Sequence, residues 1–216
     1  MITNYDEIEK LFNEIDKVIE NKINLFVIGG AVLLQQDLKD ATKDIDIIVN
    51  TEEEFIIFQK ALETLGFKPK ITGKEYEHMD INQIFQNGDF RIDLFYKEVC
   101  GEFSLTKEMV KRANTILNLE KLNIAHCSNE DIFLFKTMTE REGDLEDCIR
   151  LGIPGINWEI IIKELQNQIK KSNQDVWITW VGERLDLLED KGLVIPIMNQ
   201  FNKLRNQYFK KIQPPN

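Results

Sequence analysis

The sequence has little of what a membrane-bound or secreted protein requires. Its longest apolar run, Leu25–Leu34, contains two glycines and is too short to cross a bilayer. The amino-terminal stretch MITNYDEIEK is acidic and lacks the basic-then-apolar pattern of a signal peptide. The three cysteines are scattered, without the spacing of a metal site. We therefore expect a cytoplasmic protein without a membrane partner.

Positive charge, serine and histidine are also scarce. The chain has 27 Lys and Arg against 37 Asp and Glu, and its net charge of -10 argues against general coating of nucleic acid, which needs cations to neutralise phosphates. It has only two histidines and no G-x-S-x-G motif, which argues against a serine hydrolase. The motifs G-x-x-x-x-G-K-[ST] and G-x-G-x-x-G are absent too. The remaining candidates for catalytic residues are therefore the carboxylates.

The hydrophobic pattern divides the chain into a part with alternating strands and helices and a purely helical part. We predict the α+β class: a mixed sheet with flanking helices over residues 1–126, and a helical domain over 127–216 packed on the functional site. The predicted strands are 23–28, 44–49, 68–71, 82–86, 90–96 and part of 115–125. The predicted helices are 5–21, 30–38, 51–66, 106–113, 128–150, 157–171, 175–190 and 196–211.

Two aspartates interrupt an apolar strand in the stretch DIDIIV. Asp44 and Asp46 point to the same face of that strand, roughly 7 Å apart along it. Asp93, in the later strand RIDLF, faces away from Ile92 and Leu94. Carboxylate oxygens suit Mg²⁺, and two such ions can stabilise both the attacking and the leaving oxygen of a phosphoryl transfer. These aspartates are therefore candidate ligands for Mg²⁺, with Mn²⁺ as the alternative ion.

A glycine pair precedes the aspartates. Gly29-Gly30 falls between a strand and a helix, where a phosphate could approach the backbone and the first N–H groups of the helix. A nucleoside triphosphate seated there would bring its metal ions to the aspartates, which makes the like charges tolerable. A glycine turn alone, or one acid on a strand, is usually structural. The conjunction of these features favours the functional interpretation.

The motif GG…TKDIDIIV followed by RIDLF resembles the nucleotidyltransferase superfamily, which has the polymerase-β-like fold. Its signature is a glycine pair, an Asp-x-Asp and a later single acid. Within that superfamily, EDIFLFKTMTEREGDLEDCIRLG resembles the AbiEii-type toxins and related nucleotidyltransferase-like proteins. The resemblance covers residues 23–151. It departs from the family at Asp40, where members often have an arginine, and Lys39 or Lys43 could replace that arginine.

The resemblance implies a role for each matched residue. Lys136 would reach the nucleotide phosphates, Arg141 would add a phosphate contact, and Asp144 would support the site. The alternatives are a lysine reaching solvent from an amphipathic helix and an exposed run of charges, above all at Glu142 and Asp147. The implied catalytic and metal-binding residues are Asp44, Asp46 and Asp93, and the implied nucleotide-binding residues are Gly29, Gly30, Thr42, Lys43, Lys136, Arg141 and Asp144.

Three functions compete. The first is a Mg²⁺-dependent nucleotidyltransferase that moves a nucleoside monophosphate from an NTP to an acceptor hydroxyl. The acceptor could be a tRNA or other RNA end, as the basic segment 199–216 suggests, and the AbiEii likeness adds a cognate antitoxin as partner. The second is a catalytically degenerate nucleotide-binding or interaction protein, supported by Asp40. The third is a two-metal phosphodiesterase, disfavoured by the glycine turn.

Overall fold

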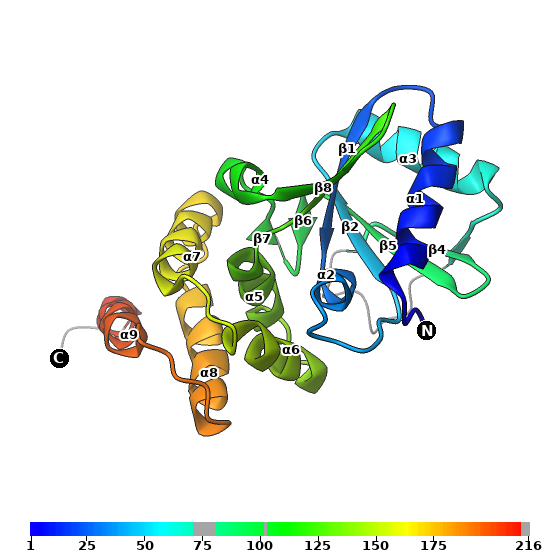
Figure 1. Cartoon of the computed structure of the whole chain (residues 1–216). Helices are drawn as coiled ribbons and strands as arrows, with labels where there is room; N and C mark the ends of the chain where they lie inside the picture. The colour runs from blue at the N-terminus through cyan, green and yellow to red at the C-terminus, as the bar shows by residue number, and fades with distance from the viewer. Residues whose placement is uncertain (71–80, 102, 213–216) are drawn as a thin grey trace. The chain divides into compact units, whose positions relative to one another are not determined.

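The computed structural model describes residues 1–70, 81–101 and 103–212 (Figure 1). The chain divides into two compact units, Met1–Ser128 and Asn129–Asn216. All the described strands lie in the first unit, and the described part of the second unit is helical. No helix within the described ranges is both long and apolar enough to cross a membrane.

The first unit is built on a mixed sheet. Its described strands follow the order β3-β4-β5-β2-β1-β9-β8. The pairs β1–β9 and β2–β5 are parallel, and the other neighbours are antiparallel. The flanking helices confirm the predicted α+β class. The strands are β1 (Ile23–Ile28), β2 (Ile45–Val49), β3 (Lys68–Lys70), β4 (Gln83–Asn87), β5 (Phe90–Tyr96), β8 (Asn114–Asn118) and β9 (Leu122–His126).

Helices α1 and α3 cover one face of the sheet, where they contact β1, β2 and β9 (Figure 1). Helix α3 starts with the predicted capping box, in which the Thr51 hydroxyl accepts the Glu54 N–H at 3.1 Å and the Glu54 carboxylate accepts the Thr51 N–H at 3.2 Å. The helices of this unit are α1 (Tyr5–Val18), α2 (Gly30–Gln35), α3 (Glu52–Thr64) and α4 (Lys107–Arg112).

The strand register decides which side chains share a face of the sheet. Tyr5 of α1 contacts His126 of β9 through a hydrogen bond, so the His126 face is the one under α1. Val27 pairs with His126 and with Ile47, and all three lie on that face. Because side chains alternate along a strand, Asp46 lies on the opposite face.

Several predicted boundaries in the first unit were wrong. The helix predicted over 5–21 ends at Val18, since Ile19 is already extended. The helix predicted over 30–38 ends at Gln35, and Asp37 follows in the left-handed region at a φ of 56°. The region 115–125 contains two strands joined by a turn in which the Leu119 N–H donates to the Leu122 carbonyl. Position 71 of the strand predicted over 68–71 lies outside the described residues.

A small two-stranded sheet escaped prediction. Strands β6 (Glu98–Val99) and β7 (Phe103–Ser104) pair in antiparallel fashion. Cys100 and Gly101 between them have positive φ angles of 55° and 74°. Each strand is too short to show the alternation on which strand prediction depends.

The second unit corrects the long helix predicted over 128–150, which breaks around residues 138–141. The Thr137 hydroxyl donates to the Leu134 carbonyl and the Thr139 hydroxyl to the Lys136 carbonyl, an alternative to helix continuation. Arg141 is then extended before the next helix. The helices of this unit are α5 (Asn129–Thr137), α6 (Glu142–Gly152), α7 (Trp158–Ser172), α8 (Trp177–Asp190) and α9 (Met198–Ile212).

Candidate functional site

Carboxylates gather on the sheet face opposite α1. Asp46 of β2 lies directly beside Asp93 of β5 in the parallel register, so the two side chains share that face on strands about 4.8 Å apart. Asp46 is half-buried, whereas only 2% of Asp93 is exposed. Asp44 is half-buried too and lies one residue before β2, not inside the strand as predicted.

The glycine pair approaches these residues closely. Gly29 has a φ of 70°, and a Cβ atom there would lie 2.1 Å from Asp46 Oδ2. A Cβ atom on Gly30 would lie 2.5 Å from the Thr42 hydroxyl oxygen. Real Cβ atoms do not approach heavy atoms so closely, so a side chain at Gly29 would displace the Asp46 carboxylate and one at Gly30 would displace the Thr42 hydroxyl. The turn between β1 and α2 therefore lies against the Asp46 carboxylate.

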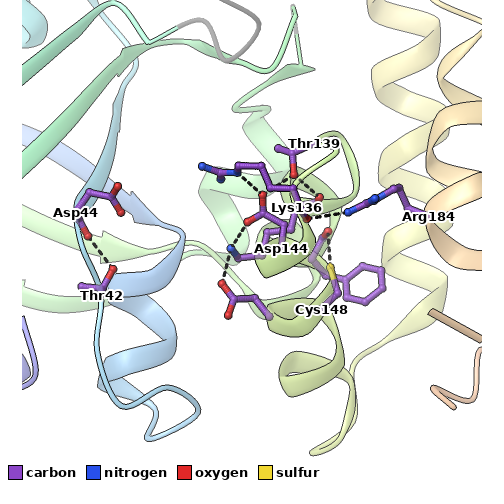
Figure 2. A network of polar contacts seen from close by, with 10 residues as sticks. Thr42, Asp44, Lys136, Thr139, Asp144, Cys148 and Arg184 are labelled. Atoms are coloured by element: carbon purple, nitrogen blue, oxygen red, sulfur yellow. Dashed lines mark hydrogen bonds and ion pairs between the residues drawn. The ribbon is translucent and has the colours of Figure 1, made fainter. Parts of the chain in front are cut away.

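Thr42 holds the segment that leads to the aspartates. Its backbone exchanges two hydrogen bonds of 2.9 Å with Ile2, and its hydroxyl donates to the Asp44 carbonyl at 3.0 Å (Figure 2). Thr42 is buried, while Lys43 beside it is exposed. The hydroxyl thus fixes the backbone of Asp44, and the roles of Thr42 and Lys43 toward a nucleotide remain predictions.

Arg91 is a member of the site that the sequence interpretation missed. Its Nε donates to Asp93 Oδ1 and a terminal nitrogen donates to Asp93 Oδ2, both at 2.7 Å. Such a two-pronged pair holds the carboxylate in one orientation. The spacing of Arg91 and Asp93 could have indicated this pair, because residues two apart on a strand share a face and opposite charges there can pair.

The donor set suits a hard cation in its chemistry. Asp44, Asp46 and Asp93 offer only oxygen ligands, which Mg²⁺ prefers. Within the described ranges, however, no three His, Cys, Asp or Glu side chains converge closely enough to form a metal-binding group. Asp93 already accepts the fork of Arg91 with both oxygens. Each oxygen keeps a second lone pair, through which Asp93 could still bind a metal ion beside Arg91.

The second unit contains a buried cluster of charges around Lys136. The Lys136 ammonium lies 2.8 Å from Asp144 Oδ1 and 2.7 Å from Asp147 Oδ2 (Figure 2). The other Asp144 oxygen accepts hydrogen bonds from the Thr139 hydroxyl and from Arg141 Nε. Lys136 is 8% exposed, so it does not reach into solvent as the alternative interpretation held.

Electrostatics in this cluster favour the charged forms. Burial opposes a charged ammonium at Lys136, but Asp144 and Asp147 outweigh it and raise the pKa of the lysine. Burial likewise opposes ionisation of Asp144, yet Lys136 and Arg141 lower its pKa to about 2. Lys136 and Asp144 are therefore both charged near neutral pH.

The other charged residues near Lys136 differ in burial and in their partners. Asp147 is buried and paired with Lys136, so the interpretation of this residue as part of an exposed run was wrong. Glu142 is exposed and pairs with Lys191, as that interpretation expected. Arg184 supports the turn before α6, since its guanidinium donates to the Arg141 carbonyl at 2.9 Å (Figure 2).

The predicted site residues thus fall into two groups, one in each unit. The first unit places the glycine turn beside Asp46 and Thr42, and Asp46 beside Asp93, whereas Asp44 is joined to Thr42 through its backbone carbonyl. The second unit brings together Lys136, Arg141 and Asp144. The contribution of each residue to nucleotide or metal binding remains a prediction.

The family model described as "Nucleotidyltransferase of unknown function (DUF6036)" matches residues 6–180. The chain belongs to this nucleotidyltransferase family. The predicted membership of the nucleotidyltransferase superfamily is confirmed, while the finer likeness to AbiEii-type toxins remains a prediction. No curated protein matches the chain.

Solved structures share the fold at low sequence identity. ANT(2")-Ia in complex with adenylyl-2"-tobramycin has a TM-score of 0.52 and 13% identity, and the match covers 79% of this chain and 99% of that one. An antigenic nucleotidyltransferase-like protein from Paracoccidioides brasiliensis has a TM-score of 0.44 and 15% identity, over 82% of this chain and 91% of that one. The first of these likenesses supports the nucleotidyltransferase-like fold.

Proposed function

We propose that the protein is a Mg²⁺-dependent nucleotidyltransferase, which transfers a nucleoside monophosphate from an NTP to an acceptor hydroxyl and releases pyrophosphate. The observation that carries this proposal is the pairing of Asp46 with Asp93 beside the glycine turn. Membership of the nucleotidyltransferase family supports it.

In this proposal Asp44, Asp46 and Asp93 hold the metal, Mg²⁺ or Mn²⁺. A bound divalent ion would supply positive charge that stabilises the transferred phosphoryl group and the leaving oxygen. Asp93 also faces the acceptor hydroxyl and takes up its proton, and Arg91 orients the Asp93 carboxylate. Gly29 and Gly30 allow the triphosphate to approach the backbone beside Asp46, next to Thr42 and Lys43.

Lys136, Arg141 and Asp144 have a supporting role in the proposal. The buried ion pairs of Lys136 leave Arg141 as the more accessible cation, because 57% of its side chain is exposed against 9% for Lys136. We assign the direct phosphate contact to Arg141. Asp144 then orients Arg141 through its hydrogen bond to Nε.

The test is release of pyrophosphate from each NTP in the presence of Mg²⁺ and a panel of acceptors: RNA, aminoglycosides and a denatured protein. The wild type should release pyrophosphate with one acceptor class. Asp46→Asn should abolish release, whereas Asp89→Asn, which alters an exposed aspartate in the β4–β5 turn, should retain it. Equal activity of Asp46→Asn and the wild type would refute the assignment of the aspartates.

Two observations favour a second candidate, a protein that binds nucleotides without turnover. Both oxygens of Asp93 are engaged by Arg91, and Asp40 stands where the family often has an arginine. Such a protein would bind NTPs in calorimetry and would release no pyrophosphate with any acceptor. Replacement of Arg91 by Gln would leave its inactivity unchanged.

The predictions of the acceptor and of a protein partner come from the sequence alone. RNA as acceptor was predicted from the basic segment 199–216, of which residues 213–216 lie outside the described part. Within α9, Arg205 pairs with Asp186 at 2.8 Å and Lys211 pairs with Asp175 at 3.2 Å. These two ion pairs within the chain thus account for part of the positive charge of α9. Co-purification from the native host would test the predicted antitoxin.

A further inference from the structure

A pocket of about 270 Å³ opens within the first unit, away from the aspartates. Its polar lining residues are Asn24 of β1, Asn50 after β2, Thr115 of β8 and Asn123 of β9. Its volume lies just below the range of about 300–1,000 Å³ for small-molecule sites, so it suits a single ring system. No residue of the lining is charged.

The pocket shares a sheet face with the proposed catalytic residues. Asn50 follows Asp46 by four residues along the same strand direction, and side chains two and four apart share a face. At about 3.3 Å per residue, the pocket starts about 13 Å from Asp46. Asn24 and Asn123 are direct partners in the β1–β9 register, which extends this polar row across the sheet.

The hydrogen bonds of the asparagines leave polar groups directed at a ligand. Asn24 is held in place at both ends, because its amide nitrogen donates to Glu54 Oε1 at 3.2 Å and its oxygen accepts from Asn123 Nδ2 at 3.1 Å. The Asn123 carboxamide oxygen is then turned away from Asn24. The side chains of Asn50 and Thr115 make no hydrogen bond to any other residue that the structure describes.

The other part of the lining is apolar. Phe26 and Ala125 are direct neighbours in the β1–β9 register, and both are buried in the sheet. Val110 of α4 and Ala113 at its C-cap complete the wall. A ligand here meets apolar surface on its faces and carboxamides at its edge. A nucleobase has that distribution, whereas a sugar ring carries hydroxyl groups all round.

We propose that this pocket binds the nucleobase of the NTP, an inference that rests on the proposed function for the position of the phosphates. Carboxamides recognise base edges through paired donor and acceptor groups. The Asn123 carboxamide oxygen, which accepts no hydrogen bond from the described residues, accepts from an exocyclic amino group. The pocket therefore favours ATP over the triphosphate of purine riboside, which lacks that amino group.

Calorimetry with ATP and with inorganic tripolyphosphate, both in Mg²⁺, tests the proposal. Asn50→Ala removes a side chain without breaking a hydrogen bond to the described residues, and Ala113→Trp fills the pocket. Each should weaken ATP binding about 3- to 10-fold and leave tripolyphosphate binding unchanged. The control is Asn114→Ala, since Asn114 pairs with His126 and lies on the opposite sheet face.

Adenosine separates this inference from the proposed function. In wild-type protein, adenosine should shift the side-chain amide NMR signals of Asn50 and Asn123, and Ala113→Trp should abolish the shifts. If adenosine binds in this way but no NTP is turned over, the pocket stands and the transferase proposal falls. Equal ATP affinity of all variants, or unmoved asparagine signals with adenosine, would overturn the pocket assignment.

Discussion

Substitution of Lys136 by methionine should destabilise the second unit strongly. Methionine keeps a chain of similar length, but it leaves two buried carboxylates, Asp144 and Asp147, without the cation between them. Removal of one partner of a buried ion pair costs about 3–5 kcal/mol, because an uncompensated buried charge remains. That is a large part of the 5–15 kcal/mol by which domains are usually stable.

The pKa of Asp144 gives a second estimate of the free energy that these ion pairs contribute. Its ordinary value of 3.8 falls to about 2 in the folded protein, and each unit corresponds to 1.36 kcal/mol. Asp144 therefore contributes about 2–3 kcal/mol, which is fully present above pH 3.8 and is lost as the pH falls through 2. In Lys136→Met the carboxylates should protonate more readily, so the deficit should shrink in acid.

Urea unfolding followed by tryptophan fluorescence measures this unit alone, since Trp158, Trp177 and Trp180 all lie within it. The control is Lys191→Met, which breaks the exposed pair with Glu142 and should leave the urea midpoint nearly unchanged. A midpoint for Lys136→Met equal to that of this control would refute the assignment of a structural charge cluster. A deficit that grows in acid would contradict the electrostatic explanation.

Three further predictions concern the first unit. Asp46→Asn should abolish Mn²⁺ binding in calorimetry yet leave the melting temperature equal or higher, because it relieves repulsion from neighbouring carboxylates; a lower melting temperature would contradict that reasoning. Gly29→Ala should lower the free energy of unfolding by about 1–3 kcal/mol in urea, since its φ of 70° and the contact with Asp46 leave no room for a Cβ atom. Burial lowers the pKa of His126 to about 4, so stability should be full above pH 6.5 and fall by about 3 kcal/mol as the pH falls to 4; an unchanged slope in His126→Asn would refute this.

Local signals predicted much of the first unit because they were strong and close in sequence. Strand β1 matches its predicted bounds, and the capping box of Thr51 and Glu54 fixes the start of α3. The alternation in β5 correctly placed Asp93 away from Ile92 and Leu94, so its pairing with Asp46 needed only the strand order. The strand order itself is a long-range property that periodicity does not contain.

Side-chain pairing was harder to predict than backbone structure. Arg91 and Asp93 are two apart in a strand and so share a face, yet nothing local showed that they would pair with each other instead of with a ligand. Lys136 stands in an apolar helix, and its partners lie beyond the break between α5 and α6. Helical periodicity continues across that break, which explains why one long helix was predicted. The glycine pair looked like a phosphate turn, and its contact with Asp46 emerged only in three dimensions.

The fork between Arg91 and Asp93 also bears on how the protein is made. Zinc fingers need their metal to fold, because the free energy of metal binding supplies the free energy of folding. Here the chain supplies its own counter-ion to its most deeply buried acidic ligand candidate, two residues away on the same strand. The Asp93 charge is therefore balanced without a divalent ion, and chelators should leave the first unit folded. The Arg91 side chain is 23% exposed, so it can move into solvent when a divalent cation displaces it from Asp93.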